Sequence, residues 1–557
     1  METTAEKRLL LRVIDPQYGP DNIYRFQAKQ TISLGPVVIA TVPLQSLPWL
    51  DAEVITENNY RSFWRKAPRD KDDLPDHLAL QQERKADFVG ISASISNAVP
   101  RALEIIEAYK AMPEQLRPKG IIVGGWHAGD SPEEFLLAGA DVVVHGEAEP
   151  VIASLIEALA RGEGLEKISG ISYWSNDQIK RNPIFDPRYQ GQVGFLMVPQ
   201  EELDLLPAPN FGLVRFAKIN IVPISRVRGC SGRCRFCRVK AKPRHISPER
   251  FAQQLKILRS QGWRKFFLVD DRSEEDLEGF VAWLKEIIAW RQERKVRRFD
   301  ITAQCRLSLA EKPEVLQLMM EAGIDAVAIG YESPIPEELR AMRKPIKPGK
   351  MLEWTKVWQK HGFFIHMMKI FGYPMPPEAE PFRMPARQRA KLFWQFIKKA
   401  NPDTLQVMTL TPILGTEDWD FLESQGRIFK ELGWDKWDGL HVVFQPDEPM
   451  TPLELQKEII WLQRKFYAFR YLTPFGWFTL LVHLIHIGVV TISMPFAWLL
   501  QMPLKGWRPK LAYQPWYHVF RNAKRRFQAH LIVMSTQKKL KAFEQKLTHF
   551  LSRRKII

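Results

Sequence analysis

The sequence predicts an α/β protein with two successive β/α domains and a helical C-terminal region. Short Val- and Ile-rich runs alternate with helical stretches up to about residue 160, a second such series begins at residue 219, and the composition changes near residue 440. We place the domains at 1–165, 219–440 and 441–557, with 166–218 as a linker. A chain of 557 residues that is 45% hydrophobic is long enough for about three domains with sizeable cores.

The N-terminal domain is predicted to be a parallel sheet covered by helices on both faces. Its near-continuous β-branched runs are typical of strands buried on both sides. The expected strands are 9–15, 88–94, 120–125 and 141–146, and the expected helices are 98–111, 132–138 and 149–161. The linker contains a small hairpin around GISYWSNDQIKRNP and a proline-rich run, LDLLPAPNF.

The second series is predicted to be a partial (β/α)6 barrel. The expected strands are 220–227, 266–270, 299–304, 325–330, 364–371 and 404–410, with helices at 248–260, 276–293, 313–322, 349–360 and 385–399. Six units are too few for a closed eight-fold barrel. Because such barrels carry their chemistry at the C-terminal ends of the strands, the functional residues are expected there.

The C-terminal region contains an apolar segment, 471–504, without any Asp, Glu, Lys or Arg. Its length would suffice to span a membrane, but Pro474, Pro495 and Pro503 interrupt it and basic residues flank both sides. We therefore expect a re-entrant or in-plane element on the cytoplasmic membrane face. The open alternative is a buried core helix followed by a solvated tail.

The positive charge of the chain is concentrated in its tail. Residues 505–557 hold 14 Lys or Arg and one acidic residue, so they carry 14 − 1 = +13 of the net +17. The other 504 residues carry only +4, which argues against a nucleic-acid-binding surface. The basic amphipathic helix predicted here is of the kind attracted to anionic lipid, so a membrane surface is the expected partner.

The N-terminus, METTAEKRLLLRVID, has neither a long apolar run nor a small-residue cleavage site. We therefore expect a cytoplasmic protein that is peripheral or monotopic at the membrane. Only four cysteines are present, and three of them lie in RGCSGRCRFCRVK, residues 228–240. This grouping favours thiolate ligands in a reducing compartment over a disulfide framework.

The spacing Cys230-x3-Cys234-x2-Cys237 predicts a metal centre, because Gly229 and Gly232 let the backbone fold around three close thiolates. Iron–sulfur clusters usually take four thiolates, so three would leave one iron open to another ligand. The alternatives are a zinc site completed by His245 and three unligated thiols. The fourth cysteine, Cys305, is expected to be a small core residue.

The motif Cys-x3-Cys-x-aromatic-Cys resembles the signature of radical S-adenosylmethionine (SAM) enzymes, with Phe236 as the aromatic residue. In that family the three cysteines hold a 4Fe–4S cluster, and its open iron binds SAM. The resemblance implies that Cys230, Cys234 and Cys237 are the metal ligands. The segment ITAQCRLSLAEKPEVLQLMMEAGIDAVAIGYESP resembles the cobalamin-associated branch of the family. The implied SAM contacts are Phe236 in the cysteine motif and, at strand ends, Asp270, Asp271, Gln304, Arg306 and Glu332.

The N-terminal domain resembles the Rossmann-like cobalamin-binding domain that often precedes this barrel. The resemblance rests on ADFVGISASIS, IIVGGWHAGDSPEE and GADVVVHGEAEP, where small residues at strand ends would let a flat macrocycle approach the backbone. The implied cobalamin contacts are Ser92, Ser94, Gly124, Gly125, Gly146 and Glu147. The Asp-x-His-x-x-Gly motif that supplies a cobalt ligand in many cobalamin proteins is absent, and His127 is not assigned that role. A domain that keeps only the fold therefore remains an alternative.

These resemblances imply a cobalamin-dependent radical SAM methyltransferase acting on an unactivated carbon, with a reducing electron donor as partner. A lipid-like or secondary-metabolite substrate at the membrane surface is expected from the apolar segment and basic tail. Radical rearrangement, cyclisation or oxidation without methyl transfer is the alternative within the class. A non-catalytic membrane-tethered binding or sensor protein is the alternative from another class. No catalytic residue is assigned.

Overall fold

The computed structural model describes residues 8–20, 22, 25, 28–60, 67–296, 298–344, 346–380, 382–471, 481 and 515–554. The chain forms two compact units, which are treated separately below. Unit 1 comprises residues 1–283 and 412–438, and unit 2 comprises 284–411 and 439–557.

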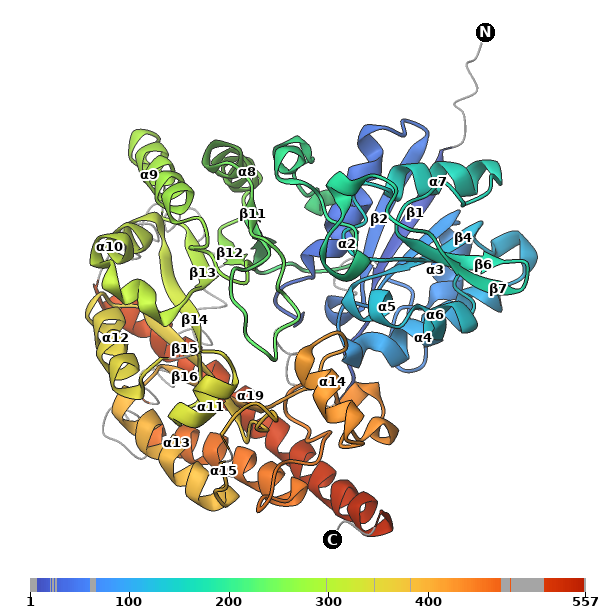
Figure 1. Ribbon diagram of the computed structural model, residues 1–557. Helices are drawn as coiled ribbons and strands as arrows, with labels where there is room; N and C mark the ends of the chain where they lie inside the picture. The colour runs from blue at the N-terminus through green and yellow to red at the C-terminus, as the bar shows by residue number, and fades with distance from the viewer. Residues whose placement is uncertain are drawn as a thin grey trace. The chain divides into compact units, whose positions relative to one another are not determined.

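Unit 1 is built on an eight-stranded sheet with the order β7-β6-β5-β4-β3-β1-β2-β8 (Figure 1). Its strands are β1 (Leu9–Asp15), β2 (Leu50–Thr56), β3 (Phe88–Ser92), β4 (Gly120–Gly124), β5 (Val142–Val144), β6 (Ile171–Ser175), β7 (Gln178–Arg181) and β8 (Val214–Arg215). Adjacent strands in the run β5-β4-β3-β1-β2-β8 pair in parallel, whereas β6 pairs antiparallel with both β5 and β7. The predicted parallel sheet is confirmed, and the predicted hairpin extends it.

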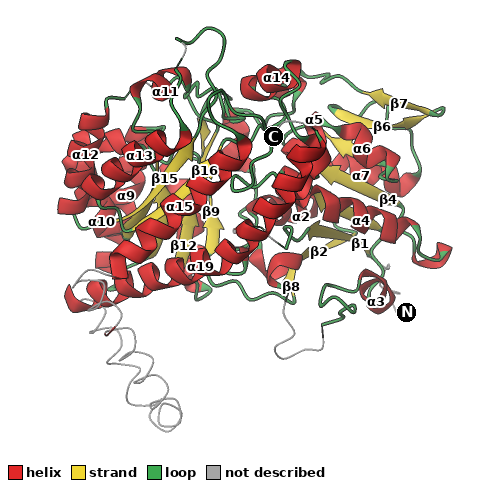
Figure 2. Ribbon diagram, turned by 90° about the horizontal axis from the view of Figure 1, so that it is seen from below, coloured by secondary structure: helices red, strands yellow, loops and turns green. Residues whose placement is uncertain are grey.

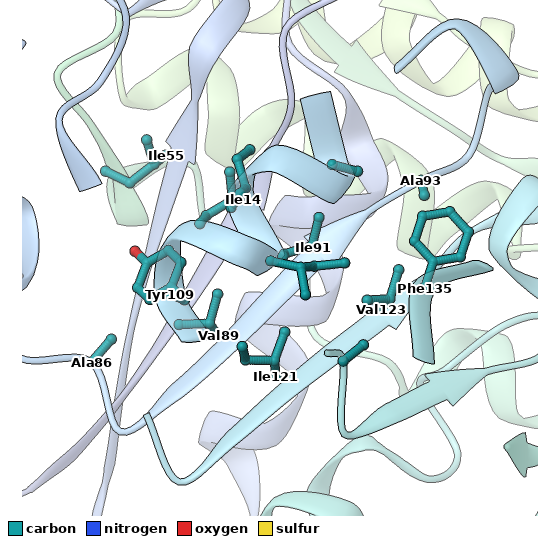
Figure 3. Close-up of a cluster of buried hydrophobic side chains, with 14 of the residues drawn as sticks. Ile14, Ile55, Ala86, Val89, Ile91, Ala93, Tyr109, Ile121, Val123 and Phe135 are labelled. Atoms are coloured by element: carbon teal, nitrogen blue, oxygen red, sulfur yellow. The ribbon is translucent and has the colours of Figure 1, made fainter. Parts of the chain in front are cut away.

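Helices cover both faces of this sheet, as the continuous apolar strands require. One face carries α3 (His77–Glu83), α4 (Val99–Lys110) and α6 (Pro132–Leu137), whose side chains join Ile14, Ile91 and Val123 in one core cluster (Figure 3). The other face carries α2 (Leu34–Thr41) and α7 (Ile152–Arg161). A short helix, α5 (Trp126–Asp130), follows β4 directly.

Strand β2 was not predicted, because Asp51 and Glu53 interrupt the continuous apolar run by which the other strands were identified. In the structure Glu53 is buried and receives a 2.7 Å hydrogen bond from Arg12 on the neighbouring strand β1. Arg12 is itself fully buried and also donates to Gln81 and Tyr109. A paired charge can therefore occupy a sheet interior, although its sequence pattern is typical of an exposed strand.

Unit 1 also contains the first two strands of the second β/α series, β9 (Val222–Ile224) and β12 (Lys265–Leu268), which pair in parallel. Between them the chain forms the two-stranded antiparallel pair β10 (Val227–Arg228) and β11 (Arg244–His245), and then α8 (Pro248–Ser260). The returning segment 412–438 contributes α14 (Glu417–Ser424).

Unit 2 contains the other four strands of the series in one parallel sheet. They are β13 (Asp300–Gln304), β14 (Ile324–Glu332), β15 (Phe364–Phe371) and β16 (Thr404–Thr409), paired in that order. The helices among them are α10 (Pro313–Ala322), α11 (Pro336–Ala341), α12 (Pro348–Lys360) and α13 (Ala386–Ala400). Helix α9 (Leu277–Glu293) precedes β13. All six predicted strands are thus present, two in unit 1 and four in unit 2.

Two C-terminal helices complete unit 2. Helix α15 (Pro452–Tyr471) lies beside β16, and α19 (Pro515–Arg553) lies beside α15 (Figure 2). Five apolar side chains in the described part of α19 are buried: Ala523, Leu540, Phe543, Leu547 and Leu551. Its arginines pair with carboxylates near the starts of strands, Arg525 with Asp300 at 2.9 Å and Arg526 with Asp403. One side of the basic tail is therefore packed against folded protein.

The apolar segment 471–504 lies almost entirely outside the described residues, so the expectation of an in-plane element concerns a part of the chain that the structure does not describe. Among the described residues, none of the helices combines the length and the apolar character needed to cross a bilayer.

Candidate functional site

The three clustered cysteines lie on the loop that connects β10 to β11. Gly229 has a φ of +85°, and a Cβ there would lie 2.7 Å from the Ala241 carbonyl oxygen, so the loop needs glycine at this position. The sulfurs of Cys230 and Cys237 accept backbone N–H groups of Gly232 and Val239, each at 3.4 Å. Such bonds favour thiolates and are the kind that tune iron–sulfur clusters.

Burial is the main cause that raises the pKa of Cys237 to about 11; the charges of Asp271, Cys234 and Cys230 also raise it, and the hydrogen bond with the Val239 backbone lowers it. A bound cation would lower the pKa of the cysteines and stabilise their thiolates. Within the described ranges, no three metal-ligating side chains already surround one point. The three thiols share one loop and have the chemistry of cluster ligands, so Cys230, Cys234 and Cys237 fit the 4Fe–4S group.

The two aspartates after β12 have different surroundings. Asp270 is buried, and its Oδ1 accepts hydrogen bonds from the Ser225 hydroxyl at 2.8 Å and from the Arg226 and Val227 backbone at 2.8 and 3.1 Å. Burial raises the pKa of Asp270 to about 7, against the effect of these hydrogen bonds. It thus fixes the turn that leads into β10. Asp271 instead lines a cavity, and burial raises its pKa to about 6.

The remaining expected SAM residues lie in unit 2, except Phe236, which is half-buried on the cysteine loop of unit 1. Gln304 ends β13 and Glu332 ends β14, and these strands are neighbours. Glu332 has a φ of +52°, unusual for a non-glycine residue, and its carboxylate lies 2.6 Å from Lys344 Nζ. Arg306 directly follows Cys305, which is buried, in keeping with the core role expected for that cysteine.

A cavity of about 840 Å³ lies within unit 1, at the C-terminal ends of β3, β4 and β5. All six residues expected to approach cobalamin line it: Ser92, Ser94, Gly124, Gly125, Gly146 and Glu147. A Cβ at Gly124 would meet no atom within 4 Å, so this glycine leaves open space. Gly125 has a φ of +117°, and a Cβ there would lie 2.6 Å from the Ser94 backbone nitrogen.

Gly146 and Glu147 are engaged in contacts of the protein itself. A Cβ at Gly146 would lie 2.4 Å from the Leu196 carbonyl oxygen. Glu147 accepts hydrogen bonds from Arg244 at 2.8 and 2.9 Å and from the Val198 backbone at 2.7 Å, and it lies 3.1 Å from Arg228. Burial alone would raise the pKa of Glu147, but these partners hold it below its usual range.

Other walls of the cavity were missed by sequence reasoning. Apolar residues of α2 and α7, such as Val38, Ile39 and Ile152, line it together with the proline-rich run 206–211. The segments on either side of the cysteine motif line it as well, with Arg228, Gly229, Val239, Ala241 and Arg244. The arginines around the cysteine motif were visible in the sequence, but the sequence could not show which carboxylates they pair with or that they line a cavity.

His127 does not line this cavity. It is buried, its ring nitrogens lie 2.9 Å from Ser96 Oγ and 3.2 Å from Glu134 Oε2, and its ring packs against Trp434. His127 is thus held in place by hydrogen bonds and ring packing within the protein.

Comparisons with known proteins match both parts of this arrangement. The radical SAM superfamily matches residues 224–381, and the B12 binding domain matches residues 65–156. An uncharacterized methyltransferase of Pyrococcus horikoshii is 28% identical over 404 residues, which cover 70% of this chain and 79% of that protein. The hopanoid C-2 methylase of Rhodopseudomonas palustris is 27% identical over 250 residues, covering 43% of this chain and 45% of the methylase.

The fold also matches a solved structure over nearly the whole chain. The cobalamin-dependent S-adenosylmethionine radical enzyme OxsB, solved with aqua-cobalamin and S-adenosylmethionine, aligns with a TM-score of 0.60 over 99% of this chain and 82% of that one. At 14% identity this likeness concerns the fold, and it confirms the predicted fold class.

The cluster assignment can be tested with the four cysteines alone. Cys234→Ala is expected to lose nearly all iron, because the two remaining thiolates cannot hold a cluster that normally takes three or four. Cys305→Ala, which removes a buried thiol outside the loop, is expected to retain the iron content of the unmodified protein. Iron and sulfide analysis after anaerobic purification measures both. Equal iron in the two variants would contradict the assignment.

Proposed function

Because the chain is a B12-binding radical SAM enzyme of the methyltransferase family, we propose that it methylates an unactivated carbon of a lipid-like or secondary-metabolite substrate at a membrane surface. Its cofactors are a 4Fe–4S cluster, SAM and cobalamin. When bound, they supply the 5′-deoxyadenosyl radical that removes a hydrogen atom and the methyl group that replaces it.

One observation carries the proposal: a single cavity is bordered by the strand ends of the B12-type sheet and by residues flanking the cluster cysteines. Two cofactors that act on the same carbon must be held next to it together, and the protein contributes their position and the exclusion of water. Ser92, Ser94, Gly124 and Gly125 leave the open end of the sheet free for a macrocycle. The apolar residues of α2 and α7 would enclose its less polar parts.

We assign the SAM contacts to Phe236, Asp271, Gln304, Arg306 and Glu332. The support is their position at or just after strand ends and on the cysteine loop. For Glu332 the left-handed backbone adds support, because strained residues concentrate at functional sites. Asp270 is a positioning residue in this assignment, since its carboxylate holds the turn before β10.

The substrate class rests on three observations. A relative is named for methylating a hopanoid, the cavity wall is largely apolar, and the C-terminal region carries a charge-free segment. An apolar substrate has few groups to hydrogen-bond, so shape and water exclusion would select it.

Methyl transfer is tested by incubating the reconstituted protein with SAM labelled in its methyl group, a strong reductant and a membrane lipid extract. The proposal predicts 5′-deoxyadenosine and the methyl label in an apolar product. Deoxyadenosine without transfer of the label would favour rearrangement, cyclisation or oxidation. If SAM were not cleaved at all, the non-catalytic alternative would hold.

Cobalamin binding in the cavity is tested with Gly124→Leu. The new side chain would project into the open space at the end of β4, so cobalt content is expected to fall sharply while iron content stays unchanged. Gly349→Leu is the matched control, because a Cβ at Gly349 on α12 also meets no atom within 4 Å but does not line the cavity. Unchanged cobalt in Gly124→Leu would contradict the assignment.

A peripheral membrane location is supported by the face of α19 that is turned away from the fold. Leu531 and Met534 are exposed there, and the exposed lysines Lys524, Lys538 and Lys541 lie on the same helix. Apolar side chains together with lysines favour the surface of an anionic bilayer. Deleting the tail would also remove the buried leucines of α19, so a deletion cannot separate membrane binding from folding.

Charge substitutions test the location more cleanly. The double variant Lys538→Gln/Lys541→Gln is expected to bind anionic vesicles about 30-fold more weakly, since each lysine near such a surface contributes about 1 kcal/mol. The control Lys356→Gln/Lys360→Gln removes two exposed lysines from α12 and is expected to bind as the unmodified protein does. Vesicle flotation measures both, and equal loss in the two variants would contradict a specific role for α19.

A further inference from the structure

The loop that holds the cluster cysteines is flanked by like charges. Arg228 and Arg244 are paired directly opposite each other in the two-stranded β10–β11 ladder, at the point where the loop leaves it. Like charges in such a pair repel and would open the base of the loop. The ladder has only two residue pairs, so it offers little stability of its own.

A carboxylate of the B12-type domain lies between these two arginines. Glu147, just after β5, contacts Arg244 at 2.8 Å through Oε1 and both arginines through Oε2, at 2.9 and 3.1 Å. Glu149 contacts the other guanidinium nitrogen of Arg228 at 2.8 Å. Two cations are thus matched by two anions, and all four side chains line the cavity.

The far end of the cysteine motif is tied to the same domain. Arg238, the residue after Cys237, pairs with Asp130 at the end of α5 at 2.8 and 3.0 Å. Its guanidinium also lies over the rings of Trp126 and Phe195, which line the cavity. Both ends of the loop are therefore anchored on residues that an occupant of the cavity would touch.

We propose that Glu147 and its partner Glu149 couple occupancy of the cavity to retention of the cluster, by fixing Arg228 and Arg244 at the base of the cysteine loop. This inference rests on the proposed assignment of the cavity to cobalamin. An occupant that packs against these four side chains restricts them to the arrangement in which the loop is closed. Thermodynamic linkage then requires that cobalamin stabilises the cluster-bearing loop and that the cluster strengthens cobalamin binding.

The loop carries a second set of anchors that do not line the cavity. Glu417 of α14 pairs with Lys240 at 2.8 Å and with Arg235 at 3.4 Å, and it comes from the returning segment 412–438. Removing its charge weakens the loop by a similar type of ion pair without altering the cavity wall. Glu417→Gln is therefore the matched control for Glu147→Gln.

The experiment measures the rate at which the anaerobically purified, cluster-loaded full-length protein loses iron to a ferrous chelator, with and without hydroxocobalamin. In the unmodified protein, cobalamin is expected to slow iron loss at least about fivefold, the lower end of typical coupling between two sites. Glu147→Gln is expected to lose iron at nearly the same rate without cobalamin and at a hydroxocobalamin concentration that saturates this variant, as its optical spectrum will show. Glu417→Gln is expected to lose iron faster in both conditions but to retain the cobalamin effect.

Three results would overturn the proposal: no effect of cobalamin on iron loss in the unmodified protein, a wild-type cobalamin effect in Glu147→Gln, or an equal loss of that effect in Glu417→Gln. Glu149→Gln, which leaves Glu147 in place, is expected to be intermediate, and it carries the test if Glu147→Gln does not fold. Gly124→Leu separates this proposal from the cavity assignment. If cobalamin slows iron loss in Gly124→Leu as in the unmodified protein, the cavity assignment fails. If Gly124→Leu loses the cobalamin effect but Glu147→Gln and Glu417→Gln do not differ, the cavity assignment stands and only the coupling through Glu147 is wrong.

Discussion

The neutralisation of a strongly basic cysteine loop by carboxylates is the constraint on which the arrangement of unit 1 depends. The segment 228–244 carries seven arginines and lysines among its three cysteines and no acidic residue. Alone, such a segment would repel itself and would bring cations together in a partly buried place. Glu147, Glu149, Asp130, Glu417 and Asp418 supply the missing negative charge from other elements. The loop therefore has its folded shape only where these elements surround it.

This constraint explains why a B12-type domain and the start of a radical SAM barrel form one compact unit. Three of the five carboxylates follow β4 and β5 of the eight-stranded sheet, where the cavity opens. The small residues at the same strand ends keep that opening free. The same edge of the sheet thus provides both the open space that we assign to the macrocycle and the anions that pair with the cysteine loop.

Much of this could be predicted from the sequence, and the failures have physical causes. Continuous apolar strands, the cysteine spacing and small residues at strand ends are local patterns. They predicted the sheet and the cysteine loop, and they placed at strand ends the six expected cobalamin contacts, all of which line the cavity. Strand β2 was missed because Glu53 looks exposed until Arg12 is known to pair with it. The cavity walls from α2 and the roles of Arg228 and Arg244 were missed because they depend on contacts between residues far apart in the sequence. Asp270 was predicted as a SAM contact, and its hydrogen bonds to the turn before β10 could not be foreseen because their donors lie far away in the sequence.

The measurement that tests this account most directly is the magnetic interaction between the reduced cluster and cob(II)alamin in the same protein. Both are paramagnetic, and electron paramagnetic resonance of the doubly loaded protein reports their dipolar coupling. If the cysteine loop and the macrocycle border one cavity, each signal should be split or broadened by the other, and Gly124→Leu should abolish the effect. Two signals identical to those of the singly loaded protein, in a sample that contains both iron and cobalt, would contradict the account.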